Sequence, residues 1–151
     1  MSTSSSSSAS TSTDPLAKKK AAASAAVVAL FKMIDQLQSN PRSDITSLDV
    51  VARGQELAQW QANITSNHYK GYSGRGHSQI VGPVASATRD PLTYDVRACL
   101  DVSKFQLLEK SGKPVPIPSG APRRVAYTYG VTQDAKTLKW YVTTEKATGT
   151  C

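Results

Sequence analysis

The sequence predicts an α+β domain in which helices cover one face of an antiparallel sheet. The hydrophobic pattern changes once along the chain: apolar residues recur every three or four positions up to about residue 66, and they alternate with polar residues from about residue 78 onward. Helices that precede all the strands favour an antiparallel sheet over the alternating order typical of a parallel one. The 151 residues are enough for one domain with a hydrophobic core, which we place at residues 14–151.

The N-terminal segment is the least complex part of the chain, because residues 2–13 contain only Ser, Thr and Ala. Such a composition cannot bury a core, so we expect residues 1–13 to be a disordered tether. We interpret it as the segment that follows a secretion or lipoprotein signal in the native precursor. A disordered cytosolic tail or a cloning remnant is the alternative.

Two helices are expected after the tether. Asp14 is placed to cap the first helix and Pro15 to occupy its first turn. This helix runs to about Gln38, and its apolar stripe consists of Val27, Phe31, Ile34 and Leu37.

The second helix is expected from about residue 47 to about residue 66. Val50, Leu57 and Ile64 form its inner stripe, Trp60 flanks that stripe, and Gly54 lies on it one turn before Leu57. Three glycines then punctuate residues 68–77, which we expect to be a polar loop.

Four strands are expected in the second half of the chain. The first covers about residues 78–87, and a turn at Asp90 and Pro91 leads to the second, at about residues 94–108. Residues 109–122 contain four prolines and form a long extended connection.

The third and fourth strands form a hairpin around a tight turn at residues 134–137. Alternation places the following side chains inward: Val125, Tyr127, Tyr129 and Val131 on the third strand, and Leu138, Trp140 and Val142 on the fourth. Lys139, Tyr141 and Thr143 then point outward.

The two cysteines bear on the compartment. Alternation along the second strand places Cys99 on the outer face, where the C-terminal residue Cys151 can reach it. A Cys99–Cys151 disulfide would contribute about 4 kcal/mol in the chain-entropy model and would imply an oxidising, extracytoplasmic compartment. The alternative is a buried Cys99 and an incidental terminal cysteine, as in a cytosolic protein.

The chain carries a formal net charge of +7, but its basic residues are mostly spread singly. This distribution is typical of a solvated surface, and no nucleic-acid recognition motif accompanies it, so we do not expect nucleic-acid binding. The sequence also has no nucleophile elbow and no histidine and cysteine cluster at zinc spacing. We therefore predict no catalytic residue, no metal and no cofactor.

Short motifs from Ile80 to the end of the chain, namely YDVRACLDVS, SGKPV, RR, KWYV and the closing TC, resemble those of small secreted proteins and lipoproteins of actinobacteria and their phages. The earlier segment ARGQELAQWQANI is similar to their second helix. These proteins look like members of the nuclear-transport-factor-2-like (NTF2-like) group. The resemblance implies a cone in which helices pack on the concave face of a curved sheet, a disulfide between the paired cysteines, and a lipid anchor upstream of this chain.

Two sets of residues are candidates for a site. His68 and His77, near Tyr69 and Tyr72, are candidate general bases, because enzymes built on this cone commonly use an Asp/His pair. A cone mouth lined by aromatic side chains is a candidate surface for a small apolar ligand or a peptide; its members are Tyr69, Tyr72, Tyr127, Tyr129 and Trp140. The last three are also explained as core residues of the sheet.

These observations favour a non-enzymatic, secreted or surface-tethered binding domain, with a surface or membrane protein as its partner and contact with the membrane only through the lipid anchor. Residues 68–77 and 109–122 are the segments expected to carry recognition, because exposed loops on a rigid scaffold often do. A phage-encoded surface exclusion factor is one form of this role. Two alternatives remain: a small cone-pocket isomerase or hydratase, and an accessory domain of a secretion, transport or conjugation complex.

Overall fold

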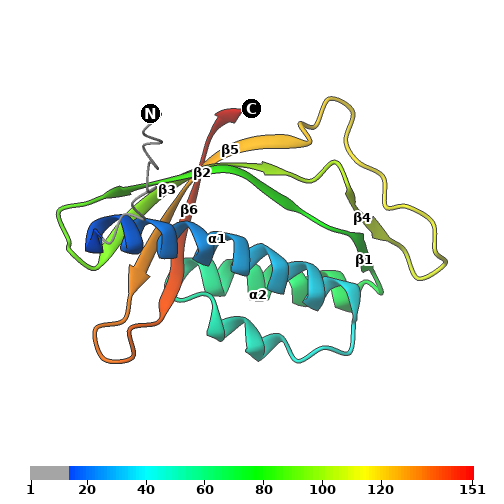
Figure 1. Ribbon diagram of the computed structural model, residues 1–151. Coiled ribbons are helices and arrows are strands. Elements are labelled where there is room, and N and C mark those ends of the chain that lie inside the picture. The colour runs from blue at the N-terminus through cyan, green and yellow to red at the C-terminus, as the bar shows by residue number, and fades with distance from the viewer. Residues whose placement is uncertain (1–13) are drawn as a thin grey trace, which may run out of the picture.

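The computed structural model describes residues 14–151, so the expected tether at residues 1–13 lies outside the described residues. Three helical segments precede six strands (Figure 1). In chain order the elements are α1 (Pro15–Ser39), the 3-10 helix η1 (Ile45–Val50), α2 (Gly54–Tyr69), β1 (Ser73–Gly76), β2 (Gln79–Ala87), β3 (Thr93–Asp101), β4 (Phe105–Leu108), β5 (Arg124–Gln133) and β6 (Trp140–Thr150).

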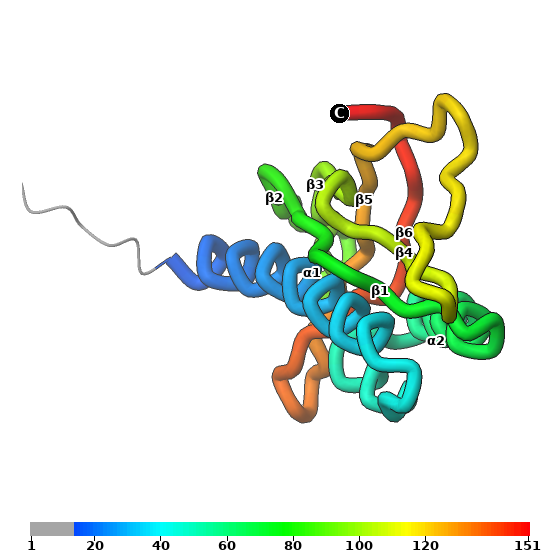
Figure 2. The backbone as a smooth tube through the Cα atoms, turned by 90° about the vertical axis from the view of Figure 1, so that its right-hand side faces the viewer, coloured from blue at the N-terminus to red at the C-terminus, as the bar shows by residue number. Residues whose placement is uncertain are grey.

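The main sheet has four antiparallel strands in the order β2-β3-β5-β6, and β1 pairs with β4 in a separate two-stranded sheet. The main sheet arches over α1 and α2, and the C-terminal end of the chain emerges on the side away from the helices (Figures 1 and 2). The α+β class and the helix-covered antiparallel sheet are therefore confirmed. Both sheets are open, and the assignment to an NTF2-like cone remains a prediction. None of the described helices has the length and apolar character needed to cross a membrane.

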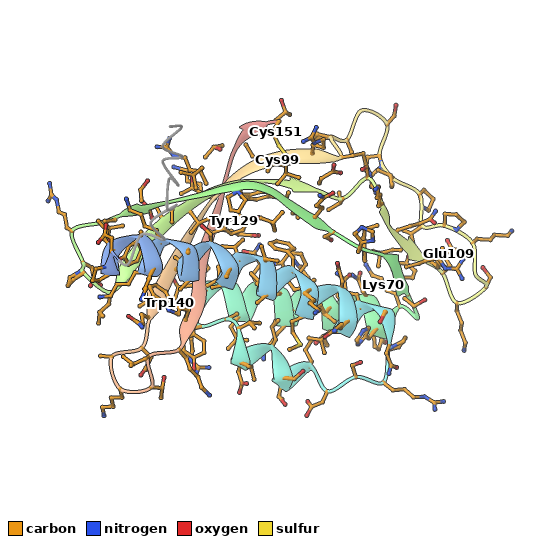
Figure 3. All side chains as sticks on the ribbon, in the orientation of Figure 1. Lys70, Cys99, Glu109, Tyr129, Trp140 and Cys151 are labelled. Carbon is orange, nitrogen blue, oxygen red and sulfur yellow. A yellow bond between two sulfur atoms is a disulfide. The ribbon has the colours of Figure 1, made fainter. Side chains whose placement is uncertain are left out.

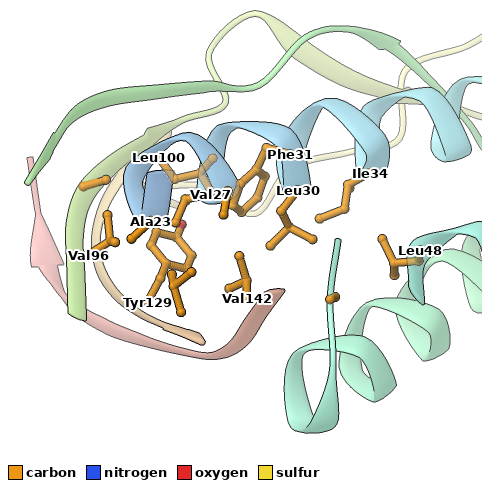
Figure 4. Packing of buried hydrophobic residues seen from close by; sticks show 14 of the residues in the cluster. Ala23, Val27, Leu30, Phe31, Ile34, Leu48, Val96, Leu100, Tyr129 and Val142 are labelled. Atoms are coloured by element: carbon orange, nitrogen blue, oxygen red, sulfur yellow. The ribbon is translucent and has the colours of Figure 1, made fainter. Parts of the chain in front are cut away.

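The core lies between α1 and the concave face of the sheet (Figure 4). The Asp14 carboxylate caps α1 by accepting a hydrogen bond from the Leu16 amide at 3.0 Å, as the sequence predicts. All four residues of the predicted stripe are buried. They pack, together with Leu30, against side chains from three strands: Val96, Tyr129 and Val142.

The prediction of one continuous second helix is wrong, because the chain breaks between η1 and α2 to pair with β6. The Val142 amide donates to the Val51 carbonyl and the Arg53 amide donates to the Val142 carbonyl, each at 3.0 Å. Gly54 then starts α2 with φ +57°, a conformation that favours glycine and that a helix interior does not contain. Val50, expected on the inner stripe, is 57% exposed.

The second predicted strand is in fact two strands, β3 and β4, which belong to different sheets. The Asp101 carboxylate accepts hydrogen bonds from the Ser103 amide at 2.9 Å and the Ser103 hydroxyl at 2.6 Å. These bonds stabilise a turn after β3, although the alternation of apolar and polar residues continues through it. β4 then pairs with β1, which lies inside the segment expected to be a loop.

The hairpin turn between β5 and β6 also differs from the expectation. Leu138, expected to point inward, belongs to the turn, has φ +61° and is 64% exposed. Tyr141 was expected on the solvent side but is only 8% exposed, because the Arg53 guanidinium lies 4.0 Å from the centre of its ring and covers it.

Candidate functional site

A β-bulge in β6 turns one glutamate into the space between the sheet and α2. Val131 pairs with Val142, but the next residue of β5, Gly130, pairs with Thr144, so Thr143 is an extra residue on β6. The side chains between this bulge and the next irregularity of β6 change face. Glu145 consequently lies opposite Tyr129, on the concave face.

Glu145 meets a second carboxyl group there, that of Glu56. Glu56 lies in the first turn of α2 and is fully buried. Its Oε1 accepts a hydrogen bond from the Trp60 indole nitrogen at 3.0 Å, and Oε1 of Glu145 accepts one from the Gln59 amide at 2.8 Å. Two adjacent turns of α2 therefore hold both carboxyl groups in place against β6.

Burial makes the charged forms of these groups unfavourable. Removal from water raises the pKa of Glu56 to about 8, with repulsion from Glu145 as the second cause and the Trp60 hydrogen bond opposing both. Burial also raises the pKa of Glu145, and hydrogen bonds from Glu56, Gln59 and Trp60 offset part of that rise. At neutral pH Glu56 therefore retains its proton.

The third member of the cluster is Tyr129, which is fully buried between α1 and the sheet (Figure 4). Burial, followed by the charge of Glu145, raises the pKa of its hydroxyl. Apart from the proton that Glu56 donates toward Glu145, three buried side-chain oxygens within residues 14–151 have no hydrogen-bond partner in the protein: Oε2 of Glu56, Oε2 of Glu145 and the Tyr129 hydroxyl. Because buried polar groups are normally paired, this concentration in one place makes the cluster the candidate functional site.

Aromatic rings surround the carboxyl pair. Phe31 makes edge-to-face contacts with Trp60 and with Tyr129, both with ring centres 5.8 Å apart, and Tyr127 stacks on Tyr129 at 5.6 Å. No basic side chain compensates the two acids. In the part of the chain that the structure describes, the one ion pair within 4.0 Å joins Arg124 and Asp101 at 3.5 Å.

The residues predicted from the sequence lie in three separate places, and Figure 3 labels one residue in each of two of them, Tyr129 and Trp140. Tyr127 and Tyr129 belong to the carboxyl cluster. Trp140 packs edge-to-face on Tyr94 with ring centres 5.5 Å apart, at the opposite end of β6 from Cys151.

The remaining four candidates lie at or beyond the C-terminal end of α2. His68 Nε2 is 2.9 Å from the Leu37 carbonyl oxygen, and the centre of the Tyr72 ring lies 5.8 Å from the Lys70 ammonium nitrogen. Tyr69, at 93%, and His77 are exposed. The structure thus does not gather the five aromatic residues of the expected mouth in one place.

The carboxylate of Asp35 lies close enough to His77 to be affected by its charge, and it fastens the residue before β2 to α1. It accepts hydrogen bonds from the Ser78 amide at 2.7 Å and from the Ser78 hydroxyl at 2.9 Å. Burial raises the pKa of Asp35, whereas these bonds and the His77 charge lower it. Since the serine hydroxyl donates to the aspartate and not to the histidine, this group fixes the chain and does not form a nucleophile with its base.

The sequence contains a signal for Glu56 but none for Glu145. Glu56, Trp60 and Ile64 are four residues apart, so they share one face of a helix, and a carboxyl on a buried face is an exception worth testing. Strict alternation places residues 139, 141 and 143 on the outer face, and it would place Glu145 there as well. Only the bulge at Thr143 turns the Glu145 side chain toward the concave face.

The predicted disulfide between Cys99 and Cys151 is confirmed, with the two Cα atoms 6.0 Å apart. It lies on the outer face of the sheet and fastens the end of β6 to β3 across the intervening β5 (Figure 3). Cys151 is exposed.

Comparison with protein-family models and with curated proteins gives no match. Among solved structures, the chain is similar to the intermembrane space region of the chloroplast protein ARC6, with a TM-score of 0.57 and 17% sequence identity. The alignment covers 82% of this chain and 92% of that one. At this level of identity the likeness concerns the fold alone.

Proposed function

We propose that this protein is a non-enzymatic extracytoplasmic interaction domain, held at a cell surface through its N-terminal segment or secreted. The observation that carries the proposal is the Cys99–Cys151 disulfide, which joins an exposed terminal residue to the outer face of the sheet. Cytosolic thiols are kept reduced, and an exposed disulfide is the kind that reductants reach first. A protein that depends on such a bond belongs in an oxidising compartment.

The structural neighbour supports the same placement by analogy of fold. The ARC6 region is, by its description, a domain of the intermembrane space. An actinobacterial or phage origin, and a lipid anchor, rest on the sequence resemblance alone.

Binding is favoured over catalysis by the burial of the acidic groups. The strongest acid/base candidate is the Glu56–Glu145 pair rather than either histidine, and in the closed arrangement that the structure describes Glu56 has no surface exposed to solvent. The segment at residues 109–122 is largely exposed and includes Ile117, whose side chain is 50% exposed. It therefore remains a candidate contact for a surface or membrane protein.

The proposal is tested on the protein taken from its source cells under conditions that block thiol exchange. Intact mass with and without reductant, followed by alkylation and peptide mapping, reports whether Cys99 and Cys151 are joined. We expect alkylation only after reduction, and the Cys151→Ser variant, which leaves one thiol, provides the reference for a labelled Cys99. Alkylation of both cysteines before reduction would overturn the extracytoplasmic assignment.

A further inference from the structure

We propose that the cluster of Glu56, Glu145 and Tyr129 binds an organic cation, that is, an ammonium or guanidinium group. The inference rests on the proposed binding function and names the chemistry of the ligand. The group is either the side chain of a lysine or arginine on a partner protein or a small free amine.

The first argument is the match between unpaired acceptors and donors. When both carboxyl groups are ionised, three buried oxygens of the cluster receive no hydrogen bond from the protein. An ammonium group offers three N–H donors and a guanidinium group five, whereas neither has an acceptor to leave unsatisfied. A cation at this place would pair with both Oε2 atoms and with the tyrosine hydroxyl, which the chain itself does not do.

The second argument is charge. Two carboxyl groups share one buried site, and no basic side chain of residues 14–151 lies within 4.0 Å of either. Without a ligand the pair retains a proton. A cation replaces that proton, which leaves to solvent, and ion pairs to two carboxylates take the place of one shared hydrogen bond.

The third argument selects an organic cation over a metal ion. The walls are the rings of Phe31, Trp60, Tyr127 and Tyr129. Aromatic faces attract ammonium and guanidinium groups. A metal ion prefers more oxygen ligands than this site offers, and no group of three or more His, Cys, Asp or Glu side chains in the described part of the chain is arranged to hold one.

The site lies one side chain beneath the surface. Trp60, Tyr127 and Glu145 are half-buried, and the hydrogen bond between Gln59 and Glu145 crosses from α2 to β6 at the exposed side. Because Gln59 is exposed, this bond marks the side from which a ligand would approach the Glu145 carboxylate. We expect a ligand to enter by displacing the Gln59 amide.

Thermal unfolding and isothermal titration calorimetry test the proposal on the full chain at pH about 8, near the pKa of Glu56, where proton competition is weaker than at neutral pH. The probes are N-acetyl-arginine amide and N-acetyl-lysine amide for a partner's side chain, putrescine for a free amine, and calcium chloride for a metal, all at one ionic strength. We expect saturable stabilisation by an organic cation, with proton release visible as a dependence of the binding heat on the buffer.

The variants Glu145→Gln and Glu56→Gln keep the shape of the side chain and remove one charge each. We expect each to weaken binding at least about tenfold, whereas Glu109→Gln, a glutamate outside the cluster, leaves it unchanged. If Glu145→Gln does not fold by circular dichroism, the Glu56→Gln result decides.

Equal binding by all variants, saturation by calcium alone, or no saturable effect of any probe would overturn the inference. The probes act on purified protein whatever its compartment, so failure here leaves the disulfide argument intact. Conversely, if the cysteines proved to be reduced in cells, a cation site measured on the purified protein would still stand.

Discussion

Replacement of Glu56 by glutamine should change how stability depends on pH. The pKa of Glu56 rises from 4.5 in the unfolded chain to about 8 in the folded protein, mainly through burial. The folded state therefore binds the proton more tightly than the unfolded state does. The resulting stabilisation is complete below about pH 4.5 and is lost as the pH rises through about 8.

The magnitude follows from the width of that window. Each pH unit between the two pKa values changes the free energy of unfolding by about 1.4 kcal/mol. Over the whole window the loss is on the order of 5 kcal/mol, which is comparable to the total stability of a small domain. Glutamine keeps the acceptor for the Trp60 indole and supplies an amide donor toward Glu145, but it cannot ionise. Glu56→Gln should therefore match the wild type near pH 5 and exceed it in stability by several kcal/mol near pH 8.

Urea unfolding followed by tryptophan fluorescence, at pH values from about 5 to about 9 and constant ionic strength, measures this difference. Groups outside the Glu56–Glu145 pair titrate in both proteins, so their effects cancel in the comparison, and the glutamine amide supplies Glu145 with a hydrogen-bond donor in place of the Glu56 proton. Glu109→Gln is the matched control, because it removes a glutamate outside the cluster and should retain the wild-type slope. An equal slope in Glu56→Gln and the wild type, or a Glu56→Gln protein less stable than the wild type near pH 8, would refute the reasoning.

Three further perturbations test the fold and the site. Cys151→Ser, or reduction, should lower stability by about 4 kcal/mol, measured by urea unfolding with reduced wild type as the matched sample; no difference would show that the disulfide constrains nothing. Gly130→Ala should destabilise by about 1–3 kcal/mol, because the added Cβ would collide with the Thr144 hydroxyl at the bulge, and unchanged thermal stability would contradict this packing. Trp60→Phe should cost about 1–3 kcal/mol and raise the pKa of Glu56 further, because its Oε1 loses a hydrogen-bond donor, and carboxyl titration by NMR should show the shift.

Local chemistry explains which elements were predictable. The first helix has a cap, a proline in the first turn and a stripe in register over its whole length, and all of these act within a few residues of the chain. The break before α2 depends instead on pairing with β6, which lies some ninety residues further along the chain. The division of β3 from β4 likewise depends on β1, a strand that has no apolar alternation of its own.

Glu145 in β6 and Cys151 directly after it show where alternation predicts the face of a side chain correctly and where it does not. Strict alternation from Val142 places both Glu145 and Cys151 on the outer face. The bulge at Thr143 shifts the pairing by one residue and turns Glu145 inward. A second irregularity, between the pairs of Ala126 and Tyr127, adds another residue and shifts the pairing again.

The two shifts cancel by the end of the strand. Thr150 pairs with Val125 on the concave face, so Cys151 points outward and meets Cys99, as alternation without any bulge would have it. Between the bulges the pattern is inverted over a few residues only, and that short inverted stretch contains Glu145. The disulfide could therefore be predicted from the sequence although the strand is irregular. The burial of Glu145 could not be predicted, because it depends on two bulges in β6 that the hydrophobic pattern does not indicate.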